Sequence, residues 1–112
     1  MRAAFSEALV RLAKTDPNVL LLTGDHGYAL FDDFRRECPA QYINAGIAEQ
    51  NMVGAAIGLS RRGKILFVST FAAFFTRAFD QIRMANYSNA NIKFVGSHAG
   101  VSIGQDGVSQ MG

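Results

Sequence analysis

Glu49 is the residue whose sequence context best suits a carboxylate that binds a ligand or transfers a proton. It lies in residues 46–52 (GIAEQNM), which follow a short apolar stretch and open a helical pattern. This order predicts a carboxylate in the first turn of a helix that directly follows a strand. Ligands of α/β proteins bind at the carboxyl edge of parallel strands, so Glu49 would lie where a ligand can reach it. An acid near the positive end of a helix is also a common stabilising feature, and the pattern alone leaves both explanations open.

Three further groups of residues follow predicted strands and could join Glu49 in one site. If the strands are parallel, their carboxyl ends share an edge and these groups converge there. An acid, two imidazoles and an aromatic wall at one edge would form a ligand site. The groups are Asp25 with His26, Thr70 with Phe71 and Phe74, and Ser97 with His98.

The elements that must position these residues alternate between strands and helices. Apolar runs predict strands at residues 19–23, 42–44, 65–69 and 91–96. Apolar residues at helical spacing predict helices at residues 2–14, 31–38, 48–59 and 71–82. Strands that alternate with helices through short turns indicate an α/β fold with a mostly parallel sheet and helices on both faces.

Composition narrows the class of protein. The chain has 112 residues, 49% of them hydrophobic, which predicts one small domain over residues 1–112 with a packed core. A net charge of +2 is too small to favour nucleic acid or an anionic membrane as a partner. Cys38 is the single cysteine, so no disulfide can form within the chain.

With no apolar run of membrane-spanning length and no expected signal peptide, we expect a cytoplasmic protein. Because a Gly-rich segment follows the last predicted strand, we expect the domain to be incomplete at its C-terminus.

Each candidate also has a simpler explanation. Aromatic residues at helical spacing, such as Phe71 and Phe74, usually belong to a core. His98 could be an ordinary loop residue, and Asp106 lies in an ordinary turn sequence, GQDG. A non-catalytic flavodoxin-like or receiver-like binding module is an alternative of another class. A receiver domain needs an aspartate at the end of its third strand, where this chain has Ser69 and Thr70, and this argues against that module.

Three segments together resemble one family. Residues 46–53, 69–83 and 97–107 resemble the pyrimidine-binding (middle) domain of transketolases, which in some prokaryotes begins a separate C-terminal subunit. The resemblance covers the chain from Arg2 to Gln110. Related deoxyxylulose-phosphate synthases and dehydrogenase E1 β-chains share the glutamate, but the Phe-rich segment and the loop from His98 to Asp106 are closer to transketolase.

The resemblance implies a role for each candidate. Glu49 would hydrogen-bond the N1′ nitrogen of the aminopyrimidine of thiamine diphosphate and help the cofactor lose the proton at its reactive carbon. Phe71 and Phe74 would wall the pyrimidine ring, with Phe74 stacked on it. Gln110 would also contact the cofactor, as in mammalian-type members.

The resemblance also implies substrate contacts. His98 and Asp106 match positions that hydrogen-bond the sugar's hydroxyls, and His98 would act with Glu49 in catalysis. Arg2 matches a position that binds the substrate phosphate. The reaction implied is the transfer of a two-carbon ketol unit between sugars or sugar phosphates.

Part of the family's site is missing from this sequence. In the family, Mg²⁺ or Ca²⁺ and the diphosphate are held by another domain with a Gly-Asp-Gly…Asn motif, which this chain lacks. We therefore expect no metal ligands here, no activity of the chain alone, and a partner subunit that carries the diphosphate domain. A homodimer or a heterotetramer would complete the site. A degenerate copy that serves only in assembly remains a further alternative, although Glu49, His98 and Asp106 are intact.

One departure from the family leads to a prediction about substrates. Between Asp25 and Phe31 the family commonly has hydroxyl or amide side chains, one of which helps hold the phosphate, whereas residues 26–30 here are HGYAL. We therefore expect the assembled enzyme to prefer a modified donor or acceptor, unphosphorylated or carrying another anion. Turnover of sugar phosphates compared with that of the free sugars measures this preference. A strong preference for ordinary sugar phosphates would contradict it.

Overall fold

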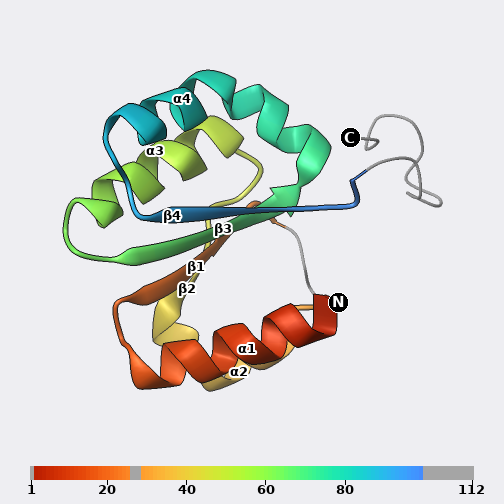
Figure 1. Cartoon of the computed structure of the whole chain (residues 1–112). Helices are drawn as coiled ribbons and strands as arrows, with labels where there is room; N and C mark the ends of the chain where they lie inside the picture. The colour runs from red at the N-terminus through yellow and green to blue at the C-terminus, as the bar shows by residue number, and fades with distance from the viewer. Residues whose placement is uncertain (1, 26–28, 100–112) are drawn as a thin grey trace.

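Four parallel strands form the centre of the molecule. The computed structural model describes residues 2–25 and 29–99. Its strands are β1 (Val19–Thr23), β2 (Tyr42–Asn44), β3 (Ile65–Phe71) and β4 (Ile92–Ser97), in the spatial order β2-β1-β3-β4 (Figure 1). β1 pairs in parallel with β2 and with β3, and β3 pairs in parallel with β4. The predicted parallel sheet is confirmed, and its four strands end at one edge.

Helices cover both faces of this sheet, which confirms the predicted α/β fold. On one face lie α1 (Arg2–Thr15) and α2 (Asp32–Glu37), and on the other lie α3 (Glu49–Ser60) and α4 (Phe79–Tyr87) (Figure 1). Two 3-10 helices, η1 (Pro39–Gln41) and η2 (Ala72–Ala78), lead into β2 and α4 respectively. Within the part of the chain that the structure describes, no helix is long and apolar enough to cross a membrane.

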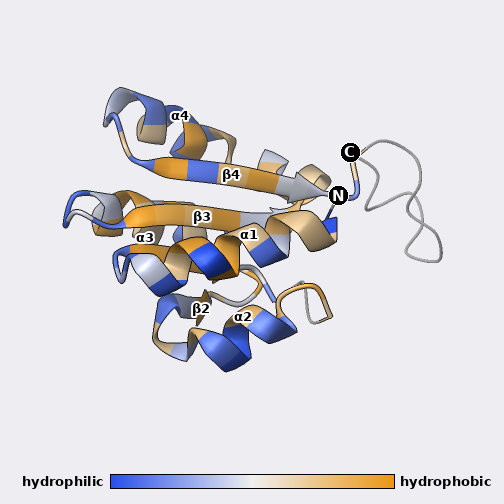
Figure 2. Cartoon of the chain, turned by 60° about the horizontal axis from the view of Figure 1, so that its bottom comes forward, coloured by the Kyte–Doolittle hydropathy of each residue, from blue (hydrophilic) through white to orange (hydrophobic). Residues whose placement is uncertain are grey.

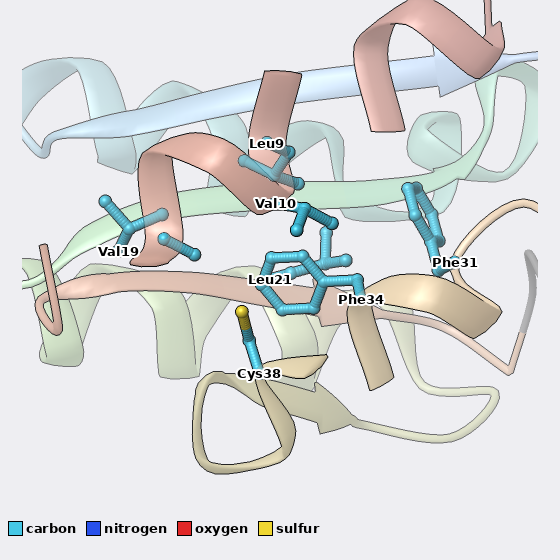
Figure 3. Packing of buried hydrophobic residues seen from close by; sticks show 8 residues of the cluster. Leu9, Val10, Val19, Leu21, Phe31, Phe34 and Cys38 are labelled. Carbon is cyan, nitrogen blue, oxygen red and sulfur yellow. The ribbon is translucent and has the colours of Figure 1, made fainter. Parts of the chain in front are cut away.

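The core consists of two clusters, one on each face of β1. Val19 and Leu21 pack with residues of α1 and α2, Phe34 among them (Figure 3). Leu20 and Leu22 point to the other face and pack against α3 and β3. β1 is buried along its whole length, as a continuous apolar run predicts. Figure 2 shows apolar residues concentrated in β3 and β4 and hydrophilic residues along α2. The sheet is therefore anchored by packed residues on both faces, and this fixes the position of the strand ends at its carboxyl edge.

A side-chain amide closes the junction between α1 and β1. Nε2 of Gln41 lies 2.9–3.0 Å from the carbonyl oxygens of Ala13, Asp16 and Val19. These carbonyls belong to the end of α1, the following turn and the first residue of β1. Satisfying such carbonyls matters because helix ends leave acceptors without partners inside the helix. Gln41 thus fixes where β1 begins relative to β2.

The predicted helix at residues 71–82 is wrong in its first half. β3 continues through Thr70 and Phe71, because the pairing with β4 extends to Phe71 opposite Ser97. A 3-10 helix then runs to residue 78, and the α-helix begins only at Phe79, whose side chain is 75% exposed. The tighter turn packs closely on β4: a Cβ on Gly96 would lie 3.0 Å from Ala72. The aromatic residues therefore do not form one continuous core stripe.

Two phenylalanines should respond very differently to truncation. Phe34 is fully buried between α2 and the sheet, so Phe34→Ala should lower the free energy of unfolding by about 3–5 kcal/mol through lost burial and a cavity. Phe79→Ala is the matched control, and its exposed ring predicts a change within about 0.5 kcal/mol. Urea unfolding followed by circular dichroism measures both. Equal losses would contradict the burial described here.

Candidate functional site

Glu49 lies in the first turn of α3, as predicted; it is the first residue of that helix, and it is buried. The turn before it contains Gly46 at a φ of 76°, a left-handed conformation that glycine adopts without strain. Asn44, the last residue of β2, shapes the turn: its Oδ1 accepts hydrogen bonds from the backbone N–H groups of Gly46 (3.0 Å) and Asp25 (2.9 Å). One amide side chain thus ties the loop after β1 to the loop after β2, which leads into α3 and Glu49.

The Glu49 carboxylate is only half satisfied. Its side chain is 4% exposed, and Nη1 of Arg77 donates to Oε1 at 3.3 Å. The other oxygen, Oε2, is buried, and no residue of the described chain gives it a hydrogen bond. An unsatisfied carboxylate oxygen in a buried place is unfavourable for stability. Such an atom indicates a position where a ligand's donor or a shared proton would be bound.

An open hollow lies over this carboxylate. It has a volume of about 430 Å³. Its walls are the first turn of α3 and the end of η2, which contribute Ala48, Glu49, Gln50, Asn51 and Arg77. Nε2 of Gln50 donates to the carbonyl oxygen of Arg77 at 3.0 Å and so joins these two walls.

Aromatic rings from β3, η2 and the end of β4 stack in a row. The rings of Phe71 and Phe74 are 5.3 Å apart and nearly parallel, at 12°. The imidazole of His98 stacks on Phe71 at 4.1 Å, and its Nδ1 lies 3.1 Å from the Ser97 hydroxyl. On Phe74, the guanidinium of Arg77 lies 4.4 Å from the ring centroid. The row therefore leads from His98 through the two phenylalanines and Arg77 to Glu49.

The structure brings together most of the predicted site. Glu49, Phe71, Phe74 and His98 come from three different strand ends and meet at the carboxyl edge. Arg2 is the exposed first residue of α1, and the first turn of α1 lies toward the carboxyl edge of the sheet, where the strands end (Figure 1). The remaining candidates, His26, Asp106 and Gln110, fall outside the described residues.

Thr70 has a setting that the sequence did not reveal. Its Oγ1 is buried without a hydrogen bond from any described residue. A Cβ placed on Gly24 would lie 3.5 Å from that hydroxyl. The end of β1 thus lies next to the Thr70 hydroxyl, at the carboxyl edge of the sheet.

Two polar residues of the site were missed in the sequence. Arg77 follows Phe74 by three residues, a spacing at which side chains share a face of a helical turn, and this was the signal that could have found it. Asn44 ends a short strand, and nothing in its sequence context distinguishes it. The described residues contain no group of three His, Cys, Asp or Glu side chains that could hold a metal ion.

Comparison with protein families gives a direct match. A family model described as "Transketolase, pyrimidine binding domain" matches residues 1–112. The chain belongs to this family of transketolase pyrimidine-binding domains. Transketolase-like protein 2 of Mus musculus is 54% identical over 112 residues, and the transketolase of Homo sapiens is 51% identical over 112 residues. Each match covers 98% of this chain and 18% of the relative, so the pyrimidine-binding domain here spans less than a fifth of these curated relatives.

Solved transketolase structures share the fold. The structure named "Split gene transketolase, inactive beta4 tetramer" has a TM-score of 0.77 and 43% identity, over 88% of this chain and 34% of that one. A transketolase from Campylobacter jejuni subsp. jejuni has a TM-score of 0.87 at 24% identity, over 97% of this chain and 18% of that one. The second similarity shows the α/β fold of the transketolase pyrimidine-binding domain.

The two explanations of Glu49 predict opposite effects on stability. If the residue serves mainly as a helix-end acid, Glu49→Gln should destabilise the fold by up to about 1 kcal/mol. Because its carboxylate is buried and half satisfied, we expect instead that Glu49→Gln leaves the free energy of unfolding unchanged or raises it by about 1–2 kcal/mol. Urea unfolding at pH 7 measures the difference, and Glu37→Gln, at an exposed ion pair with Lys14, is the surface control.

Proposed function

We propose that this chain forms the pyrimidine-binding side of a thiamine-diphosphate-dependent transketolase, which moves a two-carbon ketol unit between sugars. The observation that carries the proposal is Glu49: a buried carboxylate with one oxygen unsatisfied, at the carboxyl edge of the sheet, in a chain of this family. A residue kept only for stability would have both oxygens paired or exposed. The whole span from residue 1 to 112 would serve as this one domain.

The residues at the edge fit the pyrimidine half of the cofactor. Oε2 of Glu49 has no hydrogen bond from the described chain and could share a proton with a ring nitrogen. The nearly parallel rings of Phe71 and Phe74 form a flat apolar stack, and an aromatic heterocycle would stack on Phe74, since His98 and Phe74 already lie against Phe71. Gln110, which lies outside the described residues, would add a further contact by resemblance.

Glu49 would act through the position of one proton. When bound, thiamine diphosphate supplies a nucleophilic carbon for attack on the sugar's carbonyl group. The carboxyl of Glu49 would hold a proton against the ring nitrogen, and its burial keeps water from competing for that hydrogen bond. The first turn of α3 and the Asn44 hydrogen bonds fix the carboxyl's place at the edge.

His98 and its neighbours would bind the sugar. Nδ1 of His98 lies beside the Ser97 hydroxyl, so we assign the hydrogen bond to a substrate hydroxyl to the other ring nitrogen, Nε2. Stacking on Phe71 sets the plane of the imidazole. Asp106 would bind a second hydroxyl, and Arg2 a phosphate where the substrate carries one.

The rest of the site would come from a partner. Mg²⁺ or Ca²⁺ and the diphosphate would be bound by a subunit or domain with the diphosphate motif that this sequence lacks. The similar split-gene protein is named as an inactive beta4 tetramer, which supports assembly of this chain into an oligomer. We propose a homodimer or a heterotetramer with the partner as the active form. We place the assembly in the cytoplasm.

Replacing Glu49 separates catalysis from assembly. In the complex reconstituted with a partner that carries the diphosphate domain, Glu49→Gln should reduce ketol transfer by about 10²–10⁴-fold, the usual contribution of a proton-transfer group. Size-exclusion chromatography should show the same complex as for the unaltered chain. Glu37→Gln, remote from the edge, should keep full turnover.

Two outcomes would contradict the proposal. Unchanged turnover of the Glu49→Gln complex would favour a role in assembly alone. Ketol transfer by the chain without its partner, given thiamine diphosphate and Mg²⁺, would show that the site is complete within this chain.

A further inference from the structure

Arg77 occupies the two groups that the pyrimidine ring would use. Its guanidinium donates to Oε1 of Glu49 at 3.3 Å and lies 4.4 Å from the centroid of the Phe74 ring. A flat ligand ring that stacks on Phe74 has to take up the space in which this guanidinium lies. The same ligand needs the Glu49 carboxyl as its hydrogen-bond partner. The guanidinium holds Oε1 whereas the ring would use Oε2, so the two meet at one carboxylate and exclude one another over the Phe74 ring.

The pair is built asymmetrically. Glu49 is 4% exposed, whereas the Arg77 side chain is 55% exposed. The Glu49 carboxylate is enclosed by the protein, whereas the guanidinium can return to water at little desolvation penalty. The Arg77 backbone stays in place because its carbonyl oxygen accepts a hydrogen bond from Gln50. Because its backbone is fixed and its guanidinium is exposed to solvent, the Arg77 side chain can leave Glu49 and return to it.

The cation also compensates for an otherwise costly group. Without Arg77, a buried carboxylate would face the hollow with neither oxygen paired by the described chain. Burial of an unpaired charge is unfavourable, so a nearby guanidinium stabilises the cofactor-free edge. Once a ring nitrogen shares a proton with the carboxyl, that need disappears.

We propose that Arg77 is a displaceable counter-ion of Glu49, a positioning residue that occupies the pyrimidine place until the cofactor enters. The inference rests on the proposed function, since it names what the ring must displace. Arg77 and the cofactor would therefore compete. The Arg77 contacts must break when the cofactor binds, so the free energy of these contacts weakens cofactor binding. Arg77 therefore tunes how readily the assembled enzyme takes up thiamine diphosphate.

Binding of thiamine diphosphate to the assembled protein tests this competition directly. Arg77→Met keeps the apolar stem and removes the charge, so its dissociation constant should be about two- to tenfold lower, the range expected for one ion pair whose guanidinium is exposed and one cation–π contact. Arg77→Lys keeps the charge and should lie between Arg77→Met and the unaltered protein. Isothermal titration calorimetry at saturating Mg²⁺ gives each constant without reference to turnover.

The chain offers a matched control on α4. Arg83 pairs with Asp80 at 2.7 Å, lies over the ring of Tyr87 at 5.4 Å and is 49% exposed. The hydrogen bond from Arg83 to Asp80 raises the pKa of Arg83. Arg83→Met thus removes the same kinds of contact from a similar arginine that does not touch Glu49, and it should leave the dissociation constant unchanged. Circular dichroism of every variant checks that the fold is kept.

A second arm isolates the charge. In a Glu49→Gln background, Arg77→Met should bring a smaller gain in affinity, because a neutral amide gives the guanidinium no charge to hold. An undiminished gain would overturn the role as counter-ion. Unchanged or weaker binding by Arg77→Met in the Glu49 protein would overturn the competition itself. If the unaltered assembly binds no thiamine diphosphate at all, it is the proposed function that fails, so the two failures are distinguishable.

Discussion

The parallel hydrogen-bond ladder is the constraint on which the site depends. Parallel neighbours can be joined only by a crossover, so every strand of such a sheet ends at the same edge. β1 is paired on both sides and fixes the register of β2 through Leu22 and Ile43, and of β3 through Leu22 and Val68. Residues more than forty positions apart in the sequence are thereby brought to one edge. A shift of β1 by one residue would exchange the two core faces and scatter the site.

Stability and chemistry are separated in space by this arrangement. The apolar clusters lie on the two faces of the sheet, whereas Glu49 Oε2 and Thr70 Oγ1 lie at its carboxyl end; the third unsatisfied side-chain atom of the described residues, Oε1 of Gln81, is in α4. The well-packed faces can carry the unfavourable burial of a few polar atoms because those atoms are few and local. Asn44 and Gln41 show the opposite case, since their amides form hydrogen bonds with backbone groups of the neighbouring turns.

The sequence predicted those features that depend on burial along one short element. β1 and β2 begin and end where their apolar runs do, because a strand covered on both faces needs apolar residues throughout. Glu49 at the start of α3 was equally visible, since a helix start has local signals. The segment after β3 was not predictable in this way. Its phenylalanines keep helical spacing, but pairing with β4 and the close approach of Ala72 to Gly96 override that local preference.

The missed residues depend on contacts that no periodicity encodes. Arg77 reaches Glu49 across 28 positions, and Asn44 reaches Asp25 across 19. From the sequence alone, a long charged side chain such as that of Arg77 is expected to be solvated on the surface. Only the fold shows that its guanidinium contacts a buried carboxylate. Since the same fold leaves that head more than half exposed, Glu49 is paired by a group that water can take back. In the role proposed for it, Glu49 needs such a partner: one strong enough to allow burial before the ligand arrives, and weak enough to yield when it does.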